Sequence, residues 1–256
     1  MELLAHARIV MWEGASLWVI DATKVIGDEP RRTDFHAHHA IQVTLALGGW
    51  FKLDTADLSV RGEGVAVAAD TAHIYEAEGL VAMIFIEPES RFGRAVARDL
   101  FSESKLAAVP RDRLEHLCAG IRENYRAAKR DDASLVELGR GLLAALAAGR
   151  AQEPDARIRR VIAWAADQLD GRVSLDDAIA MAGISASRLR HLFVEQTGLP
   201  FKTYLLWLRL TRAVERIAAG VSITEAAHDA GFSDSAHLSR TFRRMFGVAP
   251  AALKMS

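Results

Sequence analysis

Two short segments near the end of the chain carry side chains that can donate several hydrogen bonds. Arginine presents a planar fork of donors that matches phosphate oxygens and the edge of guanine, and serine and histidine add shorter donors. Such groups can hydrogen-bond base edges and grip a phosphate backbone. For any single residue a solvated surface position is the alternative. The side chains are Ser187, Arg188, Arg190 and His191 in the first segment, and Ser235, His237, Ser239, Arg240, Arg243 and Arg244 in the second.

The two segments belong to an internal repeat. Residues 174–185 align with residues 222–233 at an offset of 48, and five of the twelve aligned positions are identical. After one inserted residue the similarity continues with matching pairs, which are Leu189 with Leu238, Phe193 with Phe242, and Gly198 with Gly247. Because both copies carry the same donor-rich outer face, we favour recognition of nucleic acid over a merely solvated surface.

Each copy has the signals of a helix–turn–helix. A serine followed three residues later by an acidic residue is close to a capping box, a central glycine permits a left-handed turn, a second serine can restart the chain as a helix, and a last glycine ends it. In order, these residues are Ser174, Asp177, Gly183, Ser185 and Gly198 in the first copy, and Ser222, Glu225, Gly231, Ser233 and Gly247 in the second.

A long apolar helix is predicted between the two copies, over residues 201–219. At 1.5 Å per residue it would span roughly 28 Å. That length could hold two recognition helices about one turn of DNA, roughly 34 Å, apart, so that both enter successive major grooves on one face of the duplex.

These features make residues 155–256 similar to the DNA-binding domain of the AraC/XylS transcriptional regulators. The stretch Ala230-Gly-Phe-Ser-Asp-Ser-Ala-His-Leu-Ser-Arg-Thr-Phe-Arg-Arg-Met-Phe-Gly-Val-Ala-Pro250 closely follows the family's second helix–turn–helix signature. The resemblance implies that Ser187, Arg190 and His191 face bases in one groove, that Ser235, His237, Ser239 and Arg240 face the other, and that Arg243 and Arg244 contact phosphates. The first copy departs from strongly basic relatives at Val194 and Glu195.

Composition indicates an ordinary folded protein. The 256 residues include 32 Lys and Arg against 33 Asp and Glu, and 50% are hydrophobic, which excludes a disordered or collagen-like chain. One cysteine, Cys118, excludes an intrachain disulfide and fits a reducing cytosol. The N-terminus lacks the apolar stretch of a signal peptide, and no apolar run is long enough for a membrane span, so we expect a cytoplasmic protein without membrane contact.

Charge is divided unevenly along the chain. Residues 1–154 hold 18 Lys and Arg against 23 Asp and Glu, whereas residues 155–256 hold 14 against 10. The excess of basic residues falls on the part that carries the repeat, as a DNA-binding domain requires.

Short strands are predicted in the first part of the chain. Residues 41–47 alternate apolar and polar side chains, and residues 17–20 and 81–86 are continuous apolar runs. The pair Gly48-Gly49 before Trp50 predicts a hairpin. We therefore expect an antiparallel sandwich or barrel, within an α+β multidomain protein whose C-terminal domain is all helical.

Helical spacing begins near Pro88. Two apolar stripes, at Leu114, Leu117, Cys118, Ile121 and Tyr125 and at Leu135, Leu138, Leu142 and Leu146, flank the polar segment 126–132 and predict a helical hairpin. Both helices could pack on the sheet of their own subunit. We favour a dimer interface, because two stripes offer more apolar surface than one small sheet face needs. With a linker at residues 149–155, the domains expected are 1–88 (sensor), 89–150 (dimerisation) and 151–256 (DNA binding).

The N-terminal part resembles the cupin-like sensor domain of many AraC/XylS members. His36, His38, Gln42 and Gly49 follow the first cupin motif, with glutamine in the place of glutamate. Gly62 and His73 have second-motif spacing, but Ala68, Asp70 and Ala77 replace its Pro, Gly and Asn. The resemblance implies that His36, His38 and His73 could bind a divalent metal, with Gln42 a poor fourth ligand. The alternatives are that these residues line an effector pocket, or that they are wall or surface histidines without a metal.

The sequence therefore predicts a DNA-binding transcriptional regulator, activator or repressor, that responds to a small molecule or metal through its N-terminal domain, binds double-stranded DNA as a homodimer and could contact RNA polymerase. The alternative is a metal-dependent cupin enzyme, or a metal sensor, that uses His36, His38 and His73. Nothing elsewhere matches a nucleophile–base motif, a phosphate loop or a nucleotide fingerprint, so we expect no catalytic residues.

Overall fold

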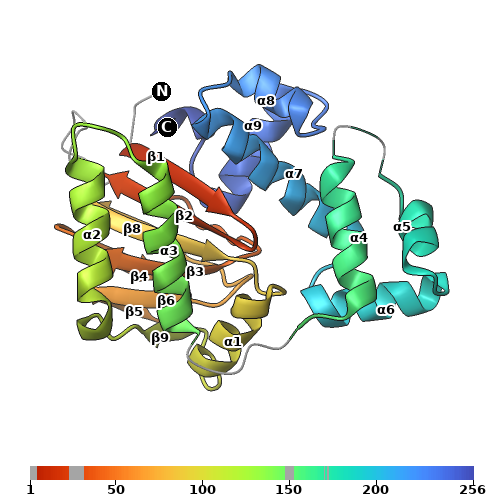
Figure 1. The fold of residues 1–256 in the computed structure, drawn as a ribbon, viewed down its shortest axis with the longest axis horizontal. Helices are drawn as coiled ribbons and strands as arrows, with labels where there is room; N and C mark the ends of the chain where they lie inside the picture. The colour runs from red at the N-terminus through yellow and green to blue at the C-terminus, as the bar shows by residue number, and fades with distance from the viewer. Residues whose placement is uncertain (1–4, 23–31, 148–152, 170, 172) are drawn as a thin grey trace.

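The computed structural model describes residues 5–22, 32–147, 153–169, 171 and 173–256 (Figure 1). A β-sheet region comes first, two helices cover one side of it, and a helical domain follows. This arrangement confirms the α+β fold that the sequence predicts. Among the described residues, no helix is both long enough and apolar enough to cross a bilayer.

The described strands form two sheets. A seven-stranded sheet has the order β10-β1-β2-β8-β3-β6-β9, and a three-stranded sheet has the order β5-β4-β7. Their pairings are antiparallel except between β10 and β1, which run parallel. The strands are β1 (Ala5–Trp12), β2 (Ala15–Asp21), β3 (Ile41–Ala46), β4 (Trp50–Asp54), β5 (Ser59–Gly62), β6 (Gly64–Val67), β7 (Ile74–Glu78), β8 (Leu80–Ile86), β9 (Leu106–Ala108) and β10 (Leu253–Met255).

The predicted hairpin at Gly48-Gly49 is wrong. Strand β3 pairs with β6 and β8, whereas β4 pairs with β5 and β7, so the two glycines carry the chain from one sheet to the other. A Cβ atom on Gly49 would lie 2.0 Å from the carbonyl oxygen of Glu78, and this close approach of two backbones explains the glycine there.

The helical hairpin packs on the sheet of its own chain. Helices α2 (Glu115–Arg126) and α3 (Asp132–Leu146) lie side by side against it (Figure 1), after α1 (Arg91–Leu100), β9 and a short 3₁₀ turn. Cys118, Ile121, Leu135 and Leu142 are completely buried in one cluster with residues of β2, β3 and β8. The apolar stripes therefore serve this packing, and a dimer interface on the remaining surface stays a prediction.

The C-terminal domain is built around one long helix, α7. It contains α4 (Ala156–Asp167), α5 (Leu175–Ala182), α6 (Ala186–Thr197), α7 (Phe201–Ala218), α8 (Ile223–Asp229) and α9 (Ser235–Phe246). The first half of α7 packs with α4, α5 and α6. Its second half, with α8 and α9, shares a hydrophobic core with β1, β2 and β8 of the sheet. The second helix–turn–helix is thus docked on the N-terminal region.

Of the predicted linker, residues 149–152 lie outside the described residues. The chain after it begins at the cap of α4, where the Asp155 carboxylate accepts a hydrogen bond from the backbone N–H of Arg157.

Candidate nucleic-acid interface and sensor cavity

The first helix–turn–helix has the local geometry that its sequence predicts. Ser174 caps α5, Gly183 turns left-handed with φ of 66°, and the Ser185 hydroxyl accepts the N–H of Arg188 at the start of α6. The side chains proposed to read DNA all lie on the exposed face of α6, and they are Ser187, Arg188, Arg190 and His191.

The second helix–turn–helix differs from its prediction at one cap. Gly231 turns left-handed with φ of 73°, as expected. Asp234, rather than Ser233, caps α9 by accepting the N–H of His237 at 2.7 Å, and this bond, followed by that from Ser233, lowers the pKa of Asp234. Asp234 is the cap because it stands immediately before the first residue of α9, where its negative carboxylate is stabilised by the partial positive charge of the free N–H groups.

The outer face of α9 carries the remaining predicted donors. Arg240, Arg243 and Arg244 are exposed, while Ser235, His237 and Ser239 are half-buried. Arg243 is not free, because its Nε donates to the Asp34 carboxylate at 2.7 Å. The Arg243 side chain, for which the sequence predicts a phosphate contact, is therefore bound to the N-terminal region in this conformation.

The end of α9 is docked into the sheet region. The ring of Phe246 lies 5.2 Å from Trp18, 5.7 Å from Phe85 and 6.4 Å from Trp207, between centroids. The next residue, Gly247, ends α9 in the left-handed region, and its carbonyl accepts the N–H of Asp34 at 2.7 Å. Sequence reasoning found Gly247 as a helix end and missed this dock, because its partners lie about 200 residues away.

The end of α6 is held by a different part of the N-terminal region. Arg94 of α1 donates through Nη2 to both the carbonyl oxygen and the side-chain Oε1 of Gln196, each at 2.9 Å. The backbone N–H of Asp155 reaches the same Oε1 at 3.0 Å. Both predicted recognition helices are thus attached to the N-terminal region by their C-terminal ends.

The three predicted histidines meet in one buried cluster. One nitrogen from each of His36, His38 and His73 lies within 4.8 Å of the others, and all three residues are buried. The ring centroids are 4.4 Å apart for His36 and His73, 5.2 Å for His38 and His73, and 5.8 Å for His36 and His38. Burial and then the adjacent His73 ring lower the pKa of His36 to about 4 and that of His38 well below its ordinary value, and burial lowers the pKa of His73.

Backbone carbonyl groups hold all three rings in the same way. The Nδ1 of His36 lies 2.9 Å from the carbonyl oxygen of Asp34, that of His38 lies 3.1 Å from Ala40, and that of His73 lies 2.8 Å from Thr71. In a neutral ring, an Nδ1 that donates its proton to a carbonyl leaves a lone pair on Nε2, as the contacts of His36 and His73 indicate. The Nε2 of His73 is buried without a hydrogen-bond partner.

Gln42 contacts the cluster through His38. Its amide lies 3.0 Å from the His38 Nε2 and 3.0 Å from the Thr44 hydroxyl. The Oε1 of Gln42 faces that Nε2, and the Nε2 of Gln42 donates to the Thr44 hydroxyl.

A small cavity adjoins the histidines. Its volume is about 80 Å³, and it lies between the sheet and the end of the DNA-binding domain. Its walls are mostly apolar, with Trp18, Phe85 and Phe246 among them, and His36 and Gln42 form part of its polar wall. We call this space the sensor cavity.

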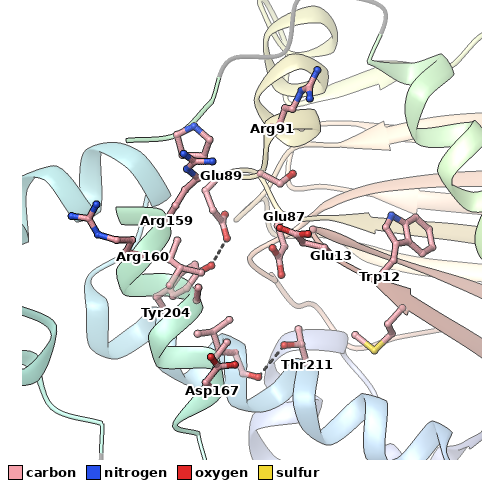
Figure 2. Close-up of a pocket in the computed structure, with 18 of the residues that line it drawn as sticks. Trp12, Glu13, Glu87, Glu89, Arg91, Arg159, Arg160, Asp167, Tyr204 and Thr211 are labelled. Atoms are coloured by element: carbon pink, nitrogen blue, oxygen red, sulfur yellow. Dashed lines mark hydrogen bonds between the residues drawn. The ribbon is translucent and has the colours of Figure 1, made fainter. Parts of the chain in front are cut away.

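A second, wider cavity of about 1200 Å³ separates the sheet region from α4 and α7 (Figure 2). Glu87 and Glu89 stand on its sheet side, and the hydroxyl of Tyr204 donates to Glu89 at 2.5 Å. Burial and then Glu89 raise the pKa of Glu87 to about 8. Burial opposes protonation of His39, but its hydrogen bonds to Asp70 and Glu89 outweigh that effect and raise its pKa to about 9. Nothing in the local sequence around these residues indicates the buried polar network that they form.

Comparison with known proteins agrees with the helix–turn–helix geometry. A family model described as a helix-turn-helix domain matches residues 179–256. The HTH-type transcriptional activator RhaS of Escherichia fergusonii is 34% identical over 104 residues, which are 40% of this chain and 37% of that protein. RhaS of Klebsiella pneumoniae is 32% identical over 108 residues, 42% of this chain and 39% of the relative. The aligned part thus spans well under half the length of these relatives.

The whole fold also has a counterpart among solved structures. ToxT from Vibrio cholerae O395 matches 94% of this chain and 96% of its own, with a TM-score of 0.60 and 13% sequence identity. A further structure, at a TM-score of 0.58 and 14% identity, is of ToxT with a bound unsaturated fatty acid. At these identities the likeness concerns the fold alone, and it extends over both the sheet region and the helical domain.

Proposed function

We propose that the chain is a transcriptional regulator of the AraC/XylS family, which binds specific double-stranded DNA and regulates transcription in response to an effector. The observation that carries this proposal is the duplicated helix–turn–helix with two exposed, donor-rich recognition helices, α6 and α9. Dimerisation through the helical segment and contact with RNA polymerase are part of the same proposal.

Different roles are proposed for the two kinds of donor. Arg190 on α6 and Arg240 on α9 are exposed near the middle of their helices, so we assign them to base edges in successive major grooves. We assign further contacts to the DNA in the same grooves to the neighbouring polar side chains. On α6 these are Ser187, Arg188 and His191, and on α9 they are Ser235, His237 and Ser239. Arg244 is assigned to a phosphate, as is Arg243 once it leaves Asp34.

Regulation follows from the way the recognition helices are attached. An effector acts only through different affinities for two arrangements of the protein. Phe246 of α9 forms part of the wall of the sensor cavity, and Arg94 holds the end of α6. A ligand in the sensor cavity would therefore change the position of α9, and with it the arrangement of α6 and α9 relative to each other.

The enzyme alternative has little left to support it. The matched relatives are named as transcriptional activators. The histidine cluster was its one argument, and the same histidines serve a sensor equally well.

The proposal is tested by mapping the DNA fragments bound by the full chain across the genome of its host. We expect a recurrent motif with two half-sites about one helical turn apart, upstream of genes whose expression changes when the regulator is deleted. Two results together would refute sequence-specific regulation. The bound fragments would share no motif, and rising salt would weaken binding to random fragments no more than binding to enriched ones.

A further inference from the structure

The histidine cluster is directly joined to the end of the second recognition helix. The carbonyl oxygen of Asp34 accepts from His36, the N–H of Asp34 donates to the carbonyl of Gly247, and the Asp34 carboxylate accepts from Arg243. One residue therefore touches both a cluster histidine and two residues at the end of α9. Gly247 itself lies so close that an added Cβ would stand 2.6 Å from the Nδ1 of His36.

The cluster has the donors that a transition metal requires. Three imidazoles around one ion, at metal–nitrogen distances of about 2.1 Å, have ring centres roughly 4.5–5.2 Å apart. The observed separations of 4.4, 5.2 and 5.8 Å bracket that range. Each Nδ1 is bonded to a carbonyl, which is the outer contact that orients metal-binding histidines and leaves Nε2 for the ion.

Two further observations point to an ion rather than to an organic ligand at this place. The Nε2 of His73 is buried and unpartnered, and a buried nitrogen lone pair without a partner has an energetic cost that a ligand would remove. The sensor cavity, at about 80 Å³, is far smaller than the roughly 300–1,000 Å³ of pockets that hold drug-sized molecules. An ion at His38 displaces one hydrogen bond, that of Gln42.

We propose that His36, His38 and His73 bind one divalent transition-metal ion, and that this ion holds the end of α9 against the sheet region through Asp34 and Gly247. The inference rests on the proposed function, for which it names the class of effector. Since coupling between two sites is reciprocal, a change in the way the end of α9 packs against Asp34 and His36 must also change the affinity for the metal.

The first test is titration of the metal-free full chain with Co²⁺, followed by the visible absorption of the bound ion. We expect one ion per chain, and loss of that signal in His73→Ala. His116→Ala, which removes an exposed histidine of α2, is the matched control and should bind as the unaltered chain does. His36→Gln, at the edge of the sensor cavity, provides a second variant in case His73→Ala fails to fold, as judged by circular dichroism. Absence of stoichiometric Co²⁺ binding by the unaltered chain would overturn the proposal.

The second test concerns the coupling to α9. Gly247→Ala pushes a methyl group against Asp34 and His36, and we expect it to weaken Co²⁺ binding at least about tenfold, as changes around metal ligands do. Gly198→Ala is the matched control. It sits at the same position of α6 with φ of 81°, and the atom closest to its added Cβ is 3.9 Å away. Equal Co²⁺ affinity in the two variants would refute the coupling.

Hydrogen exchange supplies a readout that does not depend on DNA. Co²⁺ should slow exchange of the amides of residues 243–248 in the unaltered chain, and unchanged exchange there would also refute the coupling. Because these measurements contain no DNA, they are independent of the proposed function. A chain that binds Co²⁺ but no specific DNA would overturn the proposed function alone, and a chain that binds DNA but no metal would overturn the metal site alone.

Discussion

Replacing Phe246 by alanine should undo the dock of the second helix–turn–helix. The ring is only 7% exposed and lies against Trp18 and Phe85 of the sheet. An aromatic side chain of about 200 Å² that is almost fully covered contributes roughly 4–5 kcal/mol at 25 cal/mol per Å². Measured losses for buried Phe→Ala changes are similar, about 3–5 kcal/mol.

Urea unfolding followed by tryptophan fluorescence measures this loss, because Trp18 and Trp207 flank the ring. Phe35→Ala is the matched control, since Phe35 is 56% exposed and the same substitution should cost roughly 2 kcal/mol at most. A loss for Phe246→Ala no larger than that for Phe35→Ala would refute the claim that α9 shares a core with the sheet region. The slope of the transition should also change, if the two regions then unfold separately.

Two further predictions concern buried charge and the turn glycines. Glu87→Gln should raise the free energy of unfolding at pH 8 by about 1–2 kcal/mol and change it far less at pH 5. The reason is that a carboxyl whose pKa is raised to about 8 contributes stability that is fully present below its ordinary pKa of 4.5 and is lost as the pH rises toward 8. Chemical unfolding at both pH values measures this change, and a gain that does not depend on pH would contradict it. Gly231→Ala should lower the free energy of unfolding more than Gly183→Ala does. The positive φ of Gly183 alone accounts for a loss of about 1 kcal/mol, and the space around it is open, whereas a Cβ on Gly231 would lie 2.2 Å from the carbonyl oxygen of Leu169. Equal melting temperatures of the two variants would refute this steric argument.

Local signals were sufficient to predict the helix–turn–helix units. Ser174 and Ser222 cap their helices, and Gly183 and Gly231 adopt positive φ, because these features depend on residues within one or two turns of the chain. The three cluster histidines were found by their motif spacing, and the structure brings them together.

Long-range features escaped prediction. Strand β1 lacks the alternation of a half-buried strand because its central residues are buried on both faces. Strand β10 is only three residues long and forms by pairing with β1 at the other end of the chain. The Arg243–Asp34 contact joins residues 209 positions apart, and nothing in either local sequence indicates the other. The mistaken hairpin at Gly48-Gly49 has the same origin, since Gly49 is required by its close approach to the backbone of Glu78, about which the local sequence carries no information.

The central claim is that α6 and α9 together read one duplex, and fluorescence anisotropy tests it most directly. The full chain, Arg190→Ala and Arg240→Ala would each be titrated onto an enriched genomic fragment and onto a random duplex at fixed salt. We predict that each variant loses about 1–3 kcal/mol of binding free energy on the enriched fragment and much less on the random one. If either variant retains full affinity for the enriched fragment, the two-helix account is contradicted.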